Sequence, residues 1–256
     1  DKIVTFLRLR ILKQINKQRP DSKAPISAVP MTPEERFQKA QAKTLYDAEK
    51  YQEAVEMALE LIARNPHLEQ DDGIIGFIMN CYNRSNDAQK ALKYALLNLK
   101  LEEEKTTGAG IATVGIAMYW AKYFGEYELV LMLAKKYPKY LSNYPLSRVA
   151  AKSAYYLGRY EDVVKFADNC EPHLVTGTVL DMAIESAFRV GNYIDVIKFA
   201  RLYYSIWKLP LSTLRMVVLS ARKFGDSDTE QMYSKAYDKK LISAEHPDMP
   251  SITDET

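Results

Sequence analysis

The feature that most constrains the fold of this chain is a motif that returns about every 34 residues. A glycine followed two positions later by a tyrosine occurs at Gly125, Gly158 and Gly191, and a related segment surrounds Tyr51. Anchored on the small or apolar residue at the equivalent place in each copy, six copies fall at positions 54, 91, 130, 163, 196 and 230. Their spacings are 37, 39, 33, 33 and 34 residues. A repeat of this period is typical of stacked helix pairs, in which each pair buries its apolar face against a neighbour.

Each copy predicts a first helix, a tight turn and a second helix. A glycine at 125, 158, 191 and 225 suits the left-handed backbone conformation that ends a helix. Prolines at 66, 138, 172 and 210 fall between copies, where they end one helix or open the next. The first copy has a distinct start, because Thr32 can cap a helix, Pro33 fits its first position and Glu35 completes a capping box.

These residues resemble the tetratricopeptide family of helical repeats. The match is clearest over residues 35–66, where the family's characteristic positions hold Ala42, Leu45, Tyr51, Ala54 and Pro66. The resemblance implies an all-α, right-handed α-solenoid of about six antiparallel helix pairs over residues 32–240. The 37- and 39-residue spacings depart from a strictly regular array, as does the lack of a tryptophan near the start of each unit.

The composition agrees with a helical fold and limits the class of protein. The 256 residues include only 10 Gly and 11 Pro, and 47% are hydrophobic, which is enough to bury a core without disulfides or a structural metal. With 35 basic and 33 acidic residues, the net charge is only +2. This balance argues against a disordered polyanion and against a globally basic nucleic-acid-binding protein.

Three segments outside the repeats differ from them in composition. Residues 1–19 are expected to form a basic amphipathic helix that packs on another domain or lies on an anionic membrane surface. Residues 20–31 are proline-rich and are interpreted as a linker, and residues 241–256 as a loose acidic tail. Because residues 1–20 carry +5 and the tail −4, residues 21–240 sum to only +1.

The first helices of the six pairs are expected to line a concave, basic face. In tetratricopeptide-like units, five positions of each first helix point inward, and over six units these hold eleven Lys or Arg and three acids, a net charge of +8. Such a surface attracts anions, and the interleaved tyrosines offer flat rings for contacts. The candidate binding residues are Arg36, Lys39, Lys43, Asn80, Asn83, Arg84, Tyr119, Lys122, Tyr123, Arg148, Lys152, Tyr155, Tyr156, Arg189, Arg215 and Arg222.

Three functions are compatible with this face. The first is a non-catalytic scaffold for protein–protein interaction whose groove binds an acidic extended or helical segment of a partner. The second is an accessory module of a larger polysaccharide-synthesising glycosyltransferase or its complex, in contact with an anionic glycan. The third is a helical repeat that binds RNA, against which the modest pI of 8.3 argues.

The sequence gives no positive sign of catalysis, of a cofactor or of a metal. Cys81 and Cys170 lie far apart in apolar helical contexts and are interpreted as buried free thiols, and the histidines at 67, 173 and 246 form no zinc-like pair. No nucleophile-elbow, zinc-protease or kinase motif occurs, so we expect no enzyme activity of the chain itself. No run of 18 apolar residues occurs, and we expect a cytoplasmic protein, peripheral at the inner face of a membrane if residues 1–19 bind there.

Overall fold

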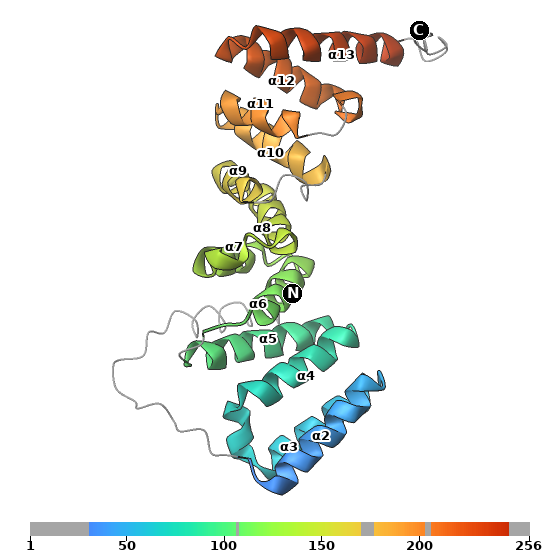
Figure 1. Cartoon of the computed structure of the whole chain (residues 1–256), viewed down its shortest axis with the longest axis vertical. Coiled ribbons are helices and arrows are strands. Elements are labelled where there is room, and N and C mark those ends of the chain that lie inside the picture. The colour runs from blue at the N-terminus through green and yellow to red at the C-terminus, as the bar shows by residue number, and fades with distance from the viewer. Residues whose placement is uncertain (1–30, 106–107, 170–176, 203–205, 246–256) are drawn as a thin grey trace.

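The computed structural model describes residues 31–105, 108–169, 177–202 and 206–245. Within these ranges the chain forms twelve α-helices and three short 3-10 helices, without a strand (Figure 1). The α-helices are α2 Pro33–Asp47, α3 Tyr51–Arg64, α4 Asp72–Arg84, α5 Ala88–Glu103, α6 Ile111–Tyr123, α7 Tyr127–Lys136, α8 Tyr144–Tyr156, α9 Tyr160–Asp168, α10 Gly177–Arg189, α11 Tyr193–Arg201, α12 Leu211–Phe224 and α13 Ser227–Glu245. The 3-10 helices are η1 Pro66–Gln70, η2 Pro138–Tyr140 and η4 Ile206–Lys208.

The twelve α-helices form six pairs stacked along one axis, as the repeat predicts (Figure 1). Each helix packs against the next one in the chain from α2 to α13. The first helices of the later pairs also pack on one another, α6 on α8, α8 on α10 and α10 on α12, whereas α4 and α6 meet at few points. The stack is therefore an α-solenoid whose first-helix layer is closed from α6 onward and more open before it.

The longer spacings of the first units have a structural cause. Between α3 and α4 the chain inserts η1, which starts at Pro66, and Leu68 of this turn is buried. Helix α5 extends over 16 residues, and the segment after it holds Gly110, the N-cap of α6. Helix α3 has 14 residues and α5 has 16, whereas α7 has 10 and α9 has 9. The 37- and 39-residue units therefore keep the helix-pair architecture and place their additional residues in longer second helices.

The tight turns confirm the role expected of the glycines and add a variation at the N-terminal end. Gly125, Gly158, Gly191 and Gly225 have φ between 69° and 81°. In the first two pairs the same place is taken by Glu49 and Asn86, which adopt φ of 60° and 59°. Because L side chains rarely adopt this conformation, these two turns are more strained than their glycine counterparts.

Both ends of the described stack can be compared with the sequence. The expected capping box is confirmed, since the Thr32 side chain accepts from the Glu35 amide and the Glu35 carboxylate accepts from the Thr32 amide at 2.7 Å. At the other end α13 continues to Glu245, beyond the boundary expected at residue 240. The helix expected over residues 1–19, the linker over 20–30 and the tail from 246 lie outside the described residues.

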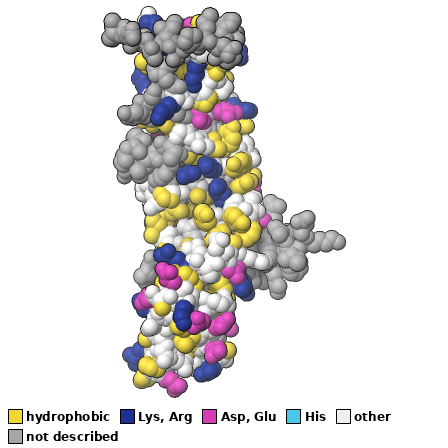
Figure 2. All heavy atoms as spheres, turned by 90° about the vertical axis from the view of Figure 1, so that its right-hand side faces the viewer, with side chains coloured by type: hydrophobic (Ala, Val, Ile, Leu, Met, Phe, Trp, Pro, Cys, Tyr) yellow, Lys and Arg dark blue, Asp and Glu magenta, His cyan; other side chains and the backbone are white. Residues whose placement is uncertain are grey.

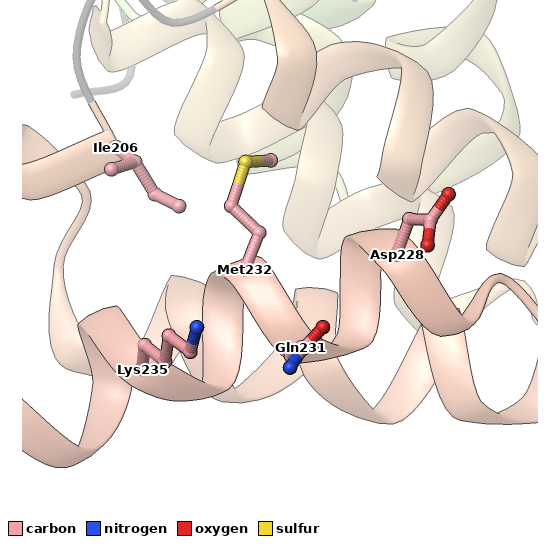
Figure 3. A pocket seen from close by; sticks show the side chains of 5 residues that line it. All are labelled: Ile206, Asp228, Gln231, Met232 and Lys235. Atoms are coloured by element: carbon pink, nitrogen blue, oxygen red, sulfur yellow. The ribbon is translucent and has the colours of Figure 1, made fainter.

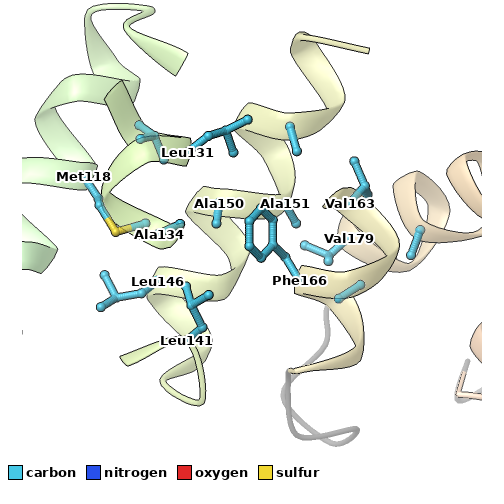
Figure 4. Packing of buried hydrophobic residues seen from close by; sticks show 14 of the residues in the cluster. Met118, Leu131, Ala134, Leu141, Leu146, Ala150, Ala151, Val163, Phe166 and Val179 are labelled. Carbon is cyan, nitrogen blue, oxygen red and sulfur yellow. The ribbon is translucent and has the colours of Figure 1, made fainter. Parts of the chain in front are cut away.

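The buried apolar residues form two clusters along the stack. One includes α3 and α4 and receives Trp120 from α6, and the other continues from α5 to α13. In the second cluster the alanines of α8 are fully buried, and Figure 4 shows Ala150 and Ala151 beside the Phe166 ring of α9. Small residues on α8 let the neighbouring helices approach closely, which explains the alanine stripe of the repeat.

The thiol of Cys81 lies inside the N-terminal cluster and is fully buried. Burial raises the pKa of this thiol to about 12, so it is protonated and unreactive at neutral pH. The interpretation of Cys81 as a buried free thiol is confirmed. Cys170 lies outside the described residues.

Candidate functional site

All sixteen candidate binding residues lie on the first helices of the pairs, and none of them is buried. We call the side of the stack that they form the first-helix face. Figure 2 views this side and shows a group of Lys and Arg side chains about midway along it, next to hydrophobic side chains. The residues are Arg36, Lys39 and Lys43 on α2; Asn80, Asn83 and Arg84 on α4; Tyr119, Lys122 and Tyr123 on α6; Arg148, Lys152, Tyr155 and Tyr156 on α8; Arg189 on α10; and Arg215 and Arg222 on α12.

At the N-terminal end of the face, most cations are held by partners within the chain. Lys43 Nζ lies 2.7 Å from a carboxylate oxygen of Asp47, and Lys39 Nζ lies 4.0 Å from Asp71. Arg84 donates to Tyr46, a contact that raises the pKa of the guanidinium. Two of the four cations on α2 and α4 are therefore paired with carboxylates, and a third, Arg84, is engaged in a hydrogen bond.

The C-terminal end is also partly neutralised. Arg189 Nη2 lies 2.6 Å from Glu185 Oε1, and the Tyr155 hydroxyl donates to the other oxygen of the same carboxylate. The hydrogen bond to Glu185, with burial, raises the pKa of Tyr155 to about 12. Burial raises the pKa of Glu185, but the hydrogen bonds from Tyr155 and Arg189 outweigh it and lower the pKa overall. Farther along, Arg222 pairs with Glu230 at 2.8 Å.

The middle of the face contains three cations that no described residue neutralises. Lys122 of α6 and Arg148 and Lys152 of α8 have no acidic partner within ion-pair distance among the described residues. Burial, followed by the charges of Arg148 and Lys122, lowers the pKa of Lys152. Arg148 and Lys122 are therefore close enough to Lys152 to repel its charge, and we call the three residues the central cation cluster. Arg36 and Arg215 also lack an acidic partner in the described chain, but they lie near opposite ends of the stack.

Exposed aromatic rings lie beside the central cation cluster. Tyr119, Tyr123 and Tyr156 are 54%, 68% and 57% exposed, which is unusually high for rings of this size. Tyr156 stacks on Tyr127 with ring centroids 5.0 Å apart and an angle of 25° between the planes. Tyr119 and Tyr123 each meet the Trp120 ring edge-on, at 5.0 and 5.4 Å. The rings are held in place by neighbours yet keep free faces toward solvent.

Next to these rings the first-helix face is hollowed where α4 and α6 diverge. The hollow measures about 400 Å³ and is lined by Asn83, Asn86, Gly115, Ile116, Tyr119 and Trp120. Trp120 Nε1 donates to Asn83 Oδ1 at 2.8 Å and so ties the two helices together across it. The sequence frame placed Asn83, Gly115 and Tyr119 on the inner face but missed Asn86, Ile116 and Trp120. The repeat pattern does not show that α4 and α6 are spaced more widely than the first helices of later pairs.

A second hollow of about 360 Å³ lies between η4 and α13, on the other layer of the stack. Figure 3 shows its lining residues, with Asp228 and Lys235 at separate places along α13 and Met232 between them. The acid and the base do not converge on one point, and the remaining lining residues are Ile206 and Gln231. This arrangement offers neither a nucleophile with an adjacent base nor a set of metal ligands.

Two further searches concern metals and membranes. Among the described residues, no group of three or more His, Cys, Asp or Glu side chains could hold a metal ion. Each helix of the described ranges is too short or too polar to cross a lipid bilayer.

Comparisons with known proteins find a likeness in structure but none in sequence. No protein-family model matches the chain, and none of the curated proteins matches its sequence. Among solved structures, the chain is similar to PilW, a widely conserved type IV pilus biogenesis factor, with 11% sequence identity and a TM-score of 0.41 over 86% of this chain and 96% of that one. At this identity and score, the likeness carries no argument about what the chain binds.

Proposed function

We propose that the chain is a non-catalytic scaffold for protein–protein interaction whose first-helix face binds an acidic segment of another protein. The observation that carries the proposal is the central cation cluster. Lys122, Arg148 and Lys152 come from two neighbouring helices and lack acidic partners in the described chain. The acidic segment would supply these missing partners.

The lowered pKa of Lys152 gives this interpretation an energetic basis. Keeping the half-buried Lys152 charged opposes folding, because its ammonium group loses hydration on burial and is repelled by Arg148 and Lys122. A carboxylate placed between them relieves the repulsion and forms charge-assisted hydrogen bonds. The cluster is therefore better suited to the bound state than to the free state, as expected for a binding surface.

The tyrosines complement the charges. Tyr119, Tyr123 and Tyr156 have exposed rings, and aromatic rings supply large contact areas with little loss of conformational entropy. Enrichment in tyrosine and arginine is characteristic of protein–protein interfaces. The proposal assigns binding rather than catalysis, because the hollows are lined by amides, aromatic rings and an Asp–Lys pair that does not converge.

The proposal can be tested before a partner is identified, by selection from a random 12-residue peptide library displayed on phage. The wild-type chain is expected to enrich sequences rich in Asp and Glu. The triple variant Lys122→Gln, Arg148→Gln, Lys152→Gln should lose that enrichment. A matched control, Arg36→Gln, Lys39→Gln, Lys43→Gln on α2, removes the same charge and should keep it.

Two results of the peptide selection would overturn the proposal. One is a wild-type selection without acidic enrichment, and the other is the same acidic enrichment in the central triple variant. Binding of polygalacturonate or oligouridylate, measured in parallel, would identify a glycan or RNA surface instead if either bound more tightly than the selected peptides. Circular dichroism of both triple variants checks that their helices are intact.

A further inference from the structure

One side of α6 connects the hollow between α4 and α6 with the central cation cluster. Tyr119 lines the hollow, and Lys122 and Tyr123 lie three and four positions later on the same helix. Residues at this spacing are neighbours on a helix surface. An extended segment that enters the hollow can therefore reach the cations by crossing α6 alone.

The geometry points to a two-part recognition of the acidic segment: an aromatic or bulky apolar side chain enters the hollow, and carboxylates about three residues away bind Lys122, Arg148 and Lys152. This inference rests on the proposed function and specifies its ligand. The stated spacing follows from the diameter of a helix, about 10 Å, and the rise of an extended chain, about 3.3 Å per residue.

The walls of the hollow suit an apolar side chain. Trp120 and Tyr119 meet edge-on with centroids 5.0 Å apart, and the exposed Tyr119 ring lines the hollow together with the half-buried Ile116. Gly115 provides part of the space. A Cβ at Gly115 would meet only Leu146 Cδ2, at 3.5 Å, an ordinary contact. A side chain would be tolerated there, so the glycine is not required by the fold at this point.

Asn83 adds a directed polar contact. The indole N–H of Trp120 can only donate, so the atom that accepts it at 2.8 Å is the Asn83 carbonyl oxygen Oδ1. This fixes the orientation of the amide and turns Nδ2 away from the indole. No acceptor for Nδ2 exists among the described residues, although Asn83 is half-buried and lines the hollow. Nδ2 is therefore free to donate to a backbone carbonyl of the entering segment.

The experiment uses two pairs of fluorescein-labelled, amide-capped peptides. In the first pair, a Phe or an Ala is separated by two glycines from three following glutamates, and in the second pair the order is reversed. Anisotropy titrations of the whole chain are expected to show that Phe binds at least tenfold more tightly than Ala in one of the two orders. Gly115→Gln, which fills the hollow, should remove that difference and leave the affinity for the Ala peptides unchanged.

Tyr119→Ala offers a second variant that does not depend on how Gly115→Gln packs, since this ring is exposed. It is expected to reduce the preference for Phe as well. The central triple variant should weaken the Phe and Ala peptides alike. Equal binding of Phe and Ala peptides to the wild-type chain in both orders, with acidic selection still dependent on the cation cluster, would overturn the inference and leave the proposed function standing. If acidic selection also fails, the proposed function itself is wrong.

Discussion

The first two helix pairs and the next two are built on one repeat, yet they differ in three respects. In α2–α5 the turns are made by Glu49 and Asn86 in a left-handed conformation, and in α6–α9 by Gly125 and Gly158. On the first-helix face, Lys39 and Lys43 of α2 pair with Asp71 and Asp47, whereas the lysines of α6 and α8 have no acidic partner among the described residues. The first helices α6 and α8 pack together, whereas α4 stands apart from α6.

These differences suggest that the two regions serve different ends. The N-terminal pairs have strained turns, and lysines of α2 form ion pairs with acidic residues of the described chain. Such contacts stabilise the stack itself. The middle pairs have glycine turns, and their first helices α6 and α8 pack closely. These two helices present the like charges of the central cation cluster. Unfavourable charge on an otherwise well-packed region agrees with the proposal that this surface binds a partner.

The largest expected effect concerns the two buried clusters. Phe166→Ala in the middle is expected to lower the free energy of unfolding by about 3–5 kcal/mol, and Ile78→Ala in α4 by about 2–5 kcal/mol, because both side chains are buried and leave cavities. Urea unfolding measures both values. In Ile78→Ala, hydrogen exchange should accelerate mainly in α2–α5, because stability in stacked repeats is largely local. Equal acceleration over all described helices would contradict the division into two regions.

A smaller effect is expected from exchanging the turn residues. Gly158→Ala should destabilise the chain by about 1 kcal/mol, because φ is 69° there and an alanine in this conformation is strained. Nothing lies within 4 Å of the added Cβ, so the loss reports conformation alone. Glu49→Gly should change stability in the opposite direction, by up to about 1 kcal/mol. Thermal unfolding of the two variants measures both changes in stability. A loss of stability in Glu49→Gly would show that its turn is not strained.

The smallest effect on stability is expected from the central cation cluster. Lys152→Gln removes a charge that burial, Arg148 and Lys122 disfavour. At pH 7 the free energy of unfolding of the variant should therefore equal that of the wild type or exceed it by no more than about 0.5 kcal/mol. The sign follows from proton binding: the folded chain releases the Lys152 proton at lower pH than the unfolded chain. The unfavourable contribution is thus complete below the lowered pKa and disappears as pH rises toward 10.5.

Urea unfolding of wild type and Lys152→Gln at pH 7 and at pH 10.5 measures this dependence. The advantage of the variant should shrink at the higher pH. A variant less stable than the wild type at pH 7 would mean that Lys152 stabilises the fold, and the cluster would then lose its significance as a binding surface.

The sequence predicted the fold in considerable detail because each of its signals is local. The repeat period, the glycines at 125, 158, 191 and 225 and the Thr32–Glu35 capping box depend only on neighbouring residues, and all are confirmed. The first-helix face was also found, since its residues follow from helical periodicity. The distribution of free charge along that face was not predicted, because partners such as Asp71 for Lys39 come from another part of the chain, here the N-cap of α4.

The hollow escaped sequence reasoning for a similar reason. Trp120 is almost fully buried and belongs to the N-terminal cluster, although it lies on α6 of the third pair. Its hydrogen bond to Asn83 spans 37 positions of the chain. Asn83 and Trp120 line an open hollow only because α4 and α6 are spaced more widely than the later first helices. Trp120, one of only two tryptophans in the chain, would have been the sequence signal.

The central claim is that the middle of the first-helix face binds acidic segments and the N-terminal end does not. Its most direct test is an NMR titration of the ¹⁵N-labelled chain with a peptide from the phage selection, followed through the backbone amides and the arginine side chains. The account predicts shift changes concentrated on Tyr119–Tyr123 and Arg148–Tyr156, with little change at Arg36–Lys43. Changes centred on α2, or on the second helices α3, α5 and α7, would contradict it.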